Sequence, residues 1–182
     1  MDSRRLLIVK KVVSLLSTMS TAKGQVECGE PFAECGNPFA ELGGELDTSG
    51  YTVVPTTVYL GRTSFTGQEK KPFITVIEAP EQPEEITLSD SDPINYHKIN
   101  LAIYGYIASD HDDNPTTPAY EFLAEIMRCL RFGQQSKLDG SVIGLTYQPG
   151  YTWQDEKTQV TYSAINVTID FEEYLDNPYQ PL

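Results

Sequence analysis

The stretch QVTYSAINVTIDF, from Gln159 to Phe171, has the most regular alternation of apolar and polar residues in the chain. Its apolar residues fall on one side of an extended strand: Ile165, Val167, Ile169 and Phe171. Its polar residues fall on the other side: Asn166, Thr168 and Asp170. A period of two residues is typical of a strand with one buried and one solvated face. This stretch therefore predicts a sheet that packs against other elements on one side.

Four further strands are predicted from runs of β-branched and aromatic residues. They cover Tyr51–Leu60, Phe73–Ile77, Lys98–Ile107 and Val142–Tyr147. Pro55 has no backbone N–H to give to a neighbour, so the first strand is expected at a sheet edge or with a bulge. The segment from Tyr147 to Trp153 contains Pro149 and Gly150, and we expect it to form the tip of a hairpin.

Two amphipathic helices are predicted. Over Ser3–Ser20, apolar residues recur at the helical spacing of three or four positions: Leu6, Val9, Val13 and Leu16. The second helix is expected to have Thr117 as its N-cap and Pro118 at its first position, and to end at Gly133. Its predicted buried face consists of Tyr120, Leu123, Ala124, Met127 and Leu130.

This order of elements predicts a single α+β domain over residues 1–182, a length that suits one domain. Its mixed or antiparallel sheet is expected to be flanked by two main helices that pack on one face. Two segments are expected to leave the domain. They are a long inserted arm over residues 24–50 and an extended C-terminal tail over residues 174–182.

The arm contains a tandem repeat. Glu27-Cys-Gly-Glu-Pro-Phe-Ala33 is followed at once by Glu34-Cys-Gly-Asn-Pro-Phe-Ala40. Glycine and proline in each copy disfavour a continuous helix or strand. The segment from 24 to 50 holds six acidic residues and no Lys or Arg. Phe32 and Phe39 predict that a neighbouring molecule buries the arm, because such side chains gain roughly 1.5–3 kcal/mol each on leaving water.

Charge and cysteine content restrict the class of protein. The net charge of −13 repels phosphates and anionic membrane surfaces, so a DNA-gripping protein is not expected. The stretch Leu6–Leu16 is too short to span a bilayer, and Lys10 and Lys11 inside it argue against a signal peptide. Three cysteines without such a signal favour a reducing cytoplasm and free thiols.

Residues with catalytic or metal-binding chemistry lack the spacing that such sites need. A zinc site is not indicated by the cysteines and histidines, which are Cys28, Cys35, Cys129, His97 and His111. The cluster Asp110–Asp113 lacks the spaced ligands and glycine of a calcium loop, which favours a solvated turn. No nucleophile elbow or glycine-rich phosphate loop occurs. We predict no catalytic residue, no metal site and no cofactor.

Several stretches recur together in one family. They are the helix Arg5–Leu16, then Val58-Tyr-Leu-Gly-Arg62, Lys71-Pro-Phe-Ile-Thr-Val76, Ile99-Asn-Leu-Ala-Ile-Tyr-Gly-Tyr106, Ile126-Met-Arg-Cys-Leu130, and Asn166-Val-Thr-Ile-Asp-Phe171 followed by Asp176-Asn-Pro-Tyr179. In this order, and without the arm, they resemble the tail-terminator (tail-completion) family of long-tailed bacteriophages. The cysteine-containing repeat departs from the family's usual pattern.

The resemblance implies a structural virion protein of the tail and neck, assembled in the bacterial host cytoplasm, and not an enzyme. Subunits of this family form a hexameric ring on the last ring of tail-tube protein, where they end tube polymerisation and join the tail to the head connector or stopper protein. DNA passes through the lumen, where an acidic lining avoids binding its phosphates. No specific DNA binding and no membrane contact are expected.

Aromatic residues are the predicted contacts, because Tyr and Trp are enriched in protein interfaces. The predicted interface residues are Phe32, Phe39, Tyr147, Tyr151, Trp153, Tyr174 and Tyr179. Other tyrosines are expected to cover sheet faces: Tyr104, Tyr106 and Tyr162. Two alternatives stay open. One is another neck component, such as a head-completion or stopper protein, and the other is a small cytoplasmic α+β enzyme or ligand-binding domain with a polar pocket.

Overall fold

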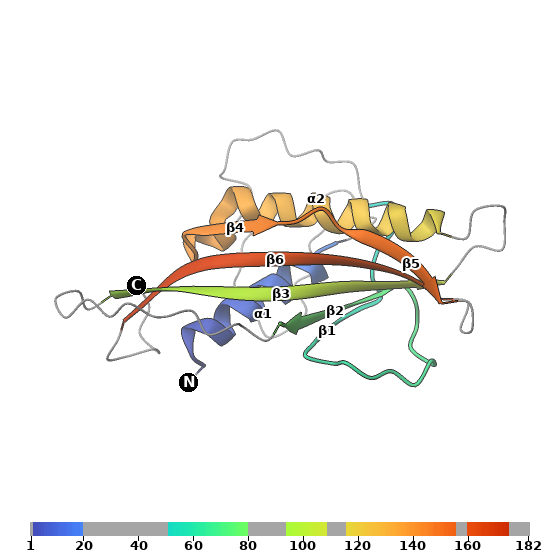
Figure 1. The fold of residues 1–182 in the computed structure, drawn as a ribbon, viewed down its shortest axis with the longest axis horizontal. Coiled ribbons are helices and arrows are strands. Elements are labelled where there is room, and N and C mark those ends of the chain that lie inside the picture. The colour runs from blue at the N-terminus through green and yellow to red at the C-terminus, as the bar shows by residue number, and fades with distance from the viewer. Residues whose placement is uncertain (1, 20–50, 80–93, 109–115, 156–159, 175–182) are drawn as a thin grey trace.

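The computed structural model describes residues 2–19, 51–79, 94–108, 116–155 and 160–174 (Figure 1). Within these ranges the chain forms two helices and a mixed sheet of six strands, so the predicted α+β class is confirmed. The elements are α1 (Arg4–Ser17), β1 (Thr57–Leu60), β2 (Phe73–Glu78), β3 (Ile94–Ala108), α2 (Thr117–Gly140), β4 (Gly144–Tyr147), β5 (Tyr151–Asp155) and β6 (Val160–Tyr174).

The sheet is built around two long central strands. Strands β3 and β6 have 15 residues each and pair antiparallel over their whole length, from Ile94 opposite Tyr174 to Ala108 opposite Val160. Figure 1 shows them running side by side along the long axis of the molecule. Strand β2 pairs with β3, and β1 lies outside β2 as a parallel edge strand. Strands β4 and β5 both pair with the other edge of β6.

Both helices cover the face of the sheet that carries the predicted apolar row of β6. Its residues Ile165, Val167, Ile169 and Phe171 are all buried as predicted, whereas Asn166 on the other face is exposed. They share one core with side chains of α1 and α2, among them Ile8, Val12, Leu16, Phe122, Ile126 and Leu130. Burial of such side chains contributes roughly 1.5–3 kcal/mol each, which makes this layer the main source of stability.

The buried face of α2 differs from the predicted one. Leu123 and Leu130 are buried as expected, but Tyr120 and Ala124 are exposed and Met127 is only half-buried. The core instead takes the stripe Ala119, Phe122, Ile126 and Cys129. Both stripes have helical spacing, so periodicity alone favoured the wrong one. Phe122 decides it, because its ring fills the space above the sheet.

Gly133 was predicted to end α2, but it lies inside the helix. A Cβ at this position would lie 2.5 Å from Leu15 Cδ2 of α1, so the glycine permits the two helices to approach closely. Regular helix geometry is lost at Lys137, Leu138 and Asp139, and Gly140 after them also has a positive φ of 71°. The N-cap is Thr116 and not Thr117, and Pro118 is therefore the second residue of the helix and not the first, as had been predicted.

Strand boundaries also differ from the predictions. Only Thr57–Leu60 of the expected strand Tyr51–Leu60 is a strand, although its predicted position at a sheet edge is confirmed. The preceding residues are held by α2, because the Arg128 guanidinium lies 4.8 Å above the Tyr51 ring and the Thr52 N–H donates to Glu125 at 3.1 Å. Strand β6 continues to Tyr174, the first residue of the expected tail. The rest of that tail and the arm lie outside the described residues.

The end of α2 is a left-handed turn. Lys137, Leu138 and Asp139 have φ values of 50°, 47° and 58°. Basic side chains of α1 hold this turn, since Arg4 donates to the Ser141 carbonyl oxygen at 3.1 Å and Lys11 to that of Leu138 at 3.4 Å. Positive charge is favourable beside the carbonyl end of a helix.

Replacing Lys137 by glycine should stabilise the protein. Left-handed geometry costs an L-residue roughly 1–2 kcal/mol and glycine much less, so we expect Lys137→Gly to raise the free energy of unfolding by about 1 kcal/mol. Urea denaturation would measure the change. The control is Gln134→Gly in the regular part of the same helix, which should lower the free energy of unfolding by about 1 kcal/mol. A loss of stability in both variants would contradict the prediction.

Gly105 of β3 should not tolerate a side chain. A Cβ there would lie 2.5 Å from Ser163 Oγ and 2.8 Å from Phe122 Cε1. We therefore expect Gly105→Ala to lower the free energy of unfolding by roughly 1–3 kcal/mol, the usual cost of overpacking. Gly144→Ala is the matched control, because its nearest neighbour would be Asp170 Oδ2 at 3.8 Å. Equal melting temperatures for the two variants would argue against this packing.

Candidate interaction surface

A β-bulge between β4 and β5 sets the direction of the predicted interface residues. Tyr147 lies opposite Val167, and Tyr151 lies opposite Ala164, so three residues on one strand face two on β6. The extra residue reverses the alternation of side chains. Tyr147 therefore faces the helices, whereas Tyr151 and Trp153 face the opposite side of the sheet.

The expected hairpin tip at this place was wrong, because the chain continues along the same edge of β6. Gly150 is part of the bulge and lies under α2. A Cβ on it would lie 2.5 Å from Leu123 Cδ1 and 2.6 Å from the Ala164 carbonyl oxygen. Pro149 and Gly150, from which a hairpin turn was predicted, are thus part of the bulge.

On the face without helices, four aromatic side chains lie in one row across four strands. Phe73 of β2, Tyr106 of β3, Tyr162 of β6 and Trp153 of β5 are direct partners in the pairing register. The Phe73 and Tyr106 rings are stacked with centroids 4.5 Å apart, and the Trp153 and Tyr162 rings are stacked at 4.9 Å. Tyr106 and Tyr162 meet edge to face at 5.0 Å. Cross-strand aromatic pairs of this kind stabilise a sheet.

Four more rings extend this row. Tyr151 stacks on Trp153 with centroids 5.4 Å apart, and Tyr104 meets Trp153 edge to face at 6.4 Å. Phe65 lies 4.8 Å from Phe73 and Tyr59 lies 5.7 Å from it. We call the eight rings together the aromatic surface: Tyr59, Phe65, Phe73, Tyr104, Tyr106, Tyr151, Trp153 and Tyr162.

The connection between the parallel strands β1 and β2 crosses one end of the aromatic surface. Its Phe65 packs on Phe73 and Tyr106, and the Thr75 hydroxyl beneath it donates to the Arg62 carbonyl oxygen at 2.7 Å. Thr75 is fully buried. The Arg62 guanidinium lies 4.7 Å from the centroid of the Tyr59 ring, a cation–π contact.

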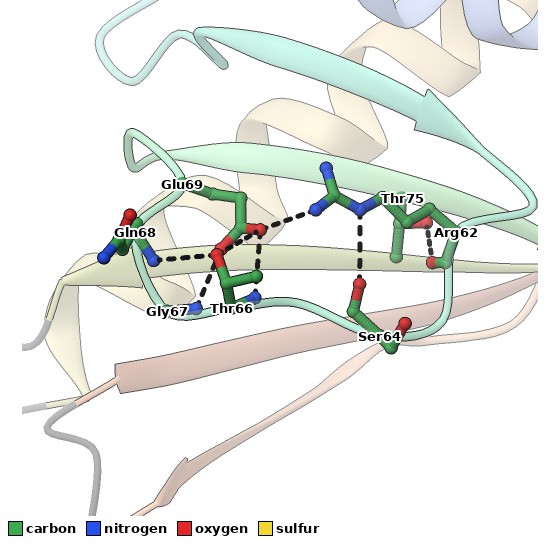
Figure 2. A network of polar contacts seen from close by, with 7 residues as sticks. All are labelled: Arg62, Ser64, Thr66, Gly67, Gln68, Glu69 and Thr75. Carbon is green, nitrogen blue, oxygen red and sulfur yellow. Dashed lines mark hydrogen bonds and ion pairs between the residues drawn. The ribbon is translucent and has the colours of Figure 1, made fainter.

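Glu69 fixes the shape of this connection (Figure 2). Its carboxylate accepts from Arg62 Nη2 at 2.7 Å and from the backbone N–H groups of Thr66 and Gly67 at 3.1 and 3.0 Å. The hydrogen bond from the Thr66 backbone lowers the pKa of Glu69, and the Arg62 charge adds to this effect. Glu69 therefore stays ionised and holds Arg62 over the rings.

Exposure of the aromatic surface is greatest at β5, whereas Tyr59 and Phe65 at the β1 end are half-buried. Phe73 is 2% exposed, whereas Trp153 is 37% and Tyr151 is 57% exposed. Burial raises the pKa of Tyr106, with smaller contributions from Tyr162 and Tyr104. Its phenol therefore stays protonated and able to donate a hydrogen bond. The part that remains open to a partner is the half at β5.

The predicted interface residues are only partly brought together. Tyr151 and Trp153 lie in the aromatic surface, but Tyr147 packs against the core on the helix side. Tyr174 ends β6 opposite Ile94. The remaining three, Phe32, Phe39 and Tyr179, lie outside the described residues. Prediction from the sequence missed Tyr59, Phe65 and Phe73 as members of the surface.

The only cysteine within the described residues is structural. Cys129 is free and buried, and its thiol donates to the Leu15 carbonyl oxygen at 3.4 Å. Burial raises its pKa to about 12, so the thiol stays protonated at neutral pH. His97 lies elsewhere, stacked on Phe171 with its Nε2 3.7 Å from a Glu173 carboxylate oxygen. Cys28, Cys35 and His111 lie outside the described ranges.

No family model and no curated protein matches the chain. In the part of the chain that the structure describes, no three His, Cys, Asp or Glu residues are arranged to hold a metal ion. Neither described helix has the length and hydropathy to cross a bilayer. The function is therefore argued from the aromatic surface.

Protonation of Glu69 should loosen the β1–β2 connection. The pKa of Glu69 is lowered in the folded state. Its contribution to the stability of the connection is therefore complete above about pH 4.5 and is lost as the pH falls through the lowered pKa. We expect Glu69→Gln to lose this contribution already at neutral pH. Faster hydrogen exchange of the Thr66 and Gly67 amides would report the loss. The control is Gln68→Glu, which keeps Glu69 and should leave these amides protected; equal protection in Glu69→Gln would contradict the assignment.

Proposed function

We propose that this protein is a structural subunit of a long-tailed phage that forms a ring on the tail tube, ends tube polymerisation and joins the tail to the head connector. The aromatic surface carries this proposal. It lies on a β-sheet and exposes Trp and Tyr, residue types that are enriched among the residues that dominate the energy of protein interfaces. A surface of this kind favours contact with another protein.

The composition of the open half supports a protein partner. Trp153 and Tyr151 keep much of their surface in water although they stack on each other. Tyrosine and tryptophan lose little conformational entropy on binding, since they have only two side-chain torsions. Because neighbouring rings already fix these two side chains, even less is lost here. The surface is therefore prepared for binding before the partner arrives.

A cap on a growing tube needs two different faces. A tube grows because each ring templates the next through a contact that never closes on itself. A terminating ring must match the tube on one side and present a different surface on the other. Within one subunit the two faces of the sheet differ, because α1 and α2 cover one face and the aromatic surface lies on the other. Its net charge of −13 suits a channel through which DNA slides without binding.

Removing the exposed rings should impair assembly without unfolding the subunit. We expect the double variant Tyr151→Ser, Trp153→Ser to lose ring formation, because each interface aromatic of this kind contributes roughly 2 kcal/mol or more, about a thirtyfold change in affinity. Native mass spectrometry and negative-stain microscopy of the purified chain would detect a six-fold ring and its loss.

The matched control is Tyr120→Ser on α2, which removes a tyrosine that is 59% exposed outside the aromatic surface. It should form rings as the unsubstituted chain does, and circular dichroism should show the same fold for all three proteins. Undiminished rings in the double variant would show that the aromatic surface is not the ring contact. A chain that stays monomeric at high concentration and on tail tubes would overturn the proposal itself.

The alternative neck role is separated by the partner. A terminator should co-purify with the tail-tube protein, whereas a head-completion or stopper protein should co-purify with the portal-side connector. Particles assembled without a terminator should carry overlong tubes without heads. No observation on the described residues favours the enzyme alternative.

A further inference from the structure

We propose that the open half of the aromatic surface binds the outer face of α1 of a neighbouring copy of this chain. The open half consists of the four rings nearest β5: Tyr104, Tyr151, Trp153 and Tyr162. The inference rests on the proposed function in one respect only, namely that copies lie side by side in a ring. It adds which two described surfaces meet there.

The covered end of the aromatic surface shows which groups its rings accept. There the chain's own Phe65 packs on Phe73 with ring centroids 4.8 Å apart. The Arg62 guanidinium lies 4.7 Å from the centroid of the Tyr59 ring, and Glu69 accepts a hydrogen bond from it at 2.7 Å. The rings at this end are thus covered by an apolar side chain beside a cation that a carboxylate holds in place.

The outer face of α1 carries the same combination of groups. Leu6 and Leu7 are 37% and 47% exposed, and Lys10 is exposed on the following turn. The Lys10 ammonium lies 2.5 Å from an Asp2 carboxylate oxygen, in an ion pair at the surface. Two apolar side chains beside a cation held by a carboxylate therefore face solvent in the part of the chain that the structure describes.

Charge and side-chain size also suit this contact. Helix α1 has four basic residues and no acidic residue over Arg4–Ser17. After Lys10 its outer face continues with the exposed Ser14 and Ser17, whose small side chains permit close approach. The rings of the open half are uncharged, and so are their neighbours on the same face: Ala102, Ala164 and Asn166. A basic helix therefore meets no like charge there, and its cation can lie against the rings.

The dimensions of the two surfaces match. The open half spans three neighbouring strands, β3, β6 and β5, which amounts to two spacings of ~4.8 Å or about 10 Å. An α-helix with its side chains is about 10–12 Å wide. One helix can therefore cover the open half, as α2 covers the other face of the same strands.

The two surfaces lie at opposite edges and on opposite faces of the sheet. Helix α1 packs over the edge strand β1, whereas the open half lies at β5, the other edge, on the face without helices. Copies can therefore overlap in succession, each with its β1 edge on the β5 edge of the next, and no surface is used twice. Such a head-to-tail contact forms a ring when the rotation between copies closes.

Other contacts between copies do not combine these two surfaces. Two aromatic surfaces pressed against each other would form a closed dimer and leave the outer face of α1 exposed. Contact through the outer face of α2 would stack copies one above another, because α2 packs over the same strands that carry the open half. Overlap through α1 is the arrangement that suits a ring of copies side by side.

Disulfide trapping with a single doubly substituted chain tests the contact. The chain carries Leu7→Cys on α1 and Tyr151→Cys on the face without helices, so the two new thiols are too far apart to bond within one chain. Cys28→Ser and Cys35→Ser remove two further thiols, and Cys129 is buried. After mild oxidation, we expect a ladder of covalent oligomers that ends at the closed ring.

The matched control carries Tyr120→Cys in place of Tyr151→Cys. Tyr120 is 59% exposed and Tyr151 is 57% exposed, so the two thiols are equally accessible. The control should yield roughly tenfold less cross-linked product, since only docking raises the local concentration of thiols. Disulfides that join position 151 to position 151 would indicate the closed dimer and overturn the inference.

Charge reversal on α1 tests the contact without cysteines. Lys10→Glu should raise the protein concentration needed for assembly roughly tenfold, because a carboxylate replaces the cation at the rings. Arg131→Glu changes the net charge equally at an exposed position on α2 and should have little effect. Trp153 is the only tryptophan of the chain, so a blue shift of its emission should report association. Equal concentration dependence in the two variants would contradict the contact.

The results separate this inference from the proposed function. Six-fold rings in which position 151 cross-links to position 7 no better than position 120 does would overturn the inference and leave the ring. A ladder that continues beyond six chains would support the contact and overturn the ring. Cross-linking of position 151 to added tail-tube protein, and not to position 7, would assign the surface to the tube and overturn the inference.

Discussion

The in-register pairing of β3 with β6 is the constraint on which the other features depend. Because these strands pair over 15 residues, the apolar side chains of both fall on one face, where α1 and α2 cover them. The same register places Tyr106 opposite Tyr162 on the other face. A shift by one residue would move every side chain to the wrong side of the sheet and destroy the core and the aromatic surface together.

The bulge between β4 and β5 adds the last part of this arrangement. Because of the bulge, β4 and β5 pair with the same edge of β6 but alternate their side chains in opposite order. Tyr147 therefore packs against the core, whereas Trp153 lies in the aromatic surface. Gly150 makes this possible by its contact with Leu123. The stability of the helix layer and the geometry of the surface are thus connected through a single glycine under α2.

The periodicity of apolar residues in the sequence predicts a buried face only where that face is set within one element. The two-residue alternation of β6 was predicted correctly, because it follows from a face buried along one element. In α1, Val9 and Leu16 are buried as predicted, but Leu6 is exposed and Val13 is half-buried, and Ile8, Val12 and Leu15 complete the buried face. The choice between two helical stripes in α2 was not decided locally, since Phe122 gains its place only through Gly105 on a distant strand. The hairpin predicted from Pro149 and Gly150 was wrong for the same reason, because the role of these residues in the bulge depends on contacts with α2 and β6.

The aromatic surface was partly visible in the sequence. Tyr104 with Tyr106, and Tyr151 with Trp153, are two residues apart, which predicts that the members of each pair share a face. Their assembly into one row depends on the register between strands far apart in the chain. That register, and the way the β1–β2 connection adds Phe65, follow only from the folded structure.

The central pairing also has a kinetic consequence, because its partners are 52 residues apart at Ala108 and Val160 and 80 apart at Ile94 and Tyr174. Contacts between such distant positions form slowly. In a partly folded chain that has paired only β1, β2 and β3, Tyr162 and Trp153 are not yet in position. The aromatic surface is then incomplete, which disfavours its association with other folding chains.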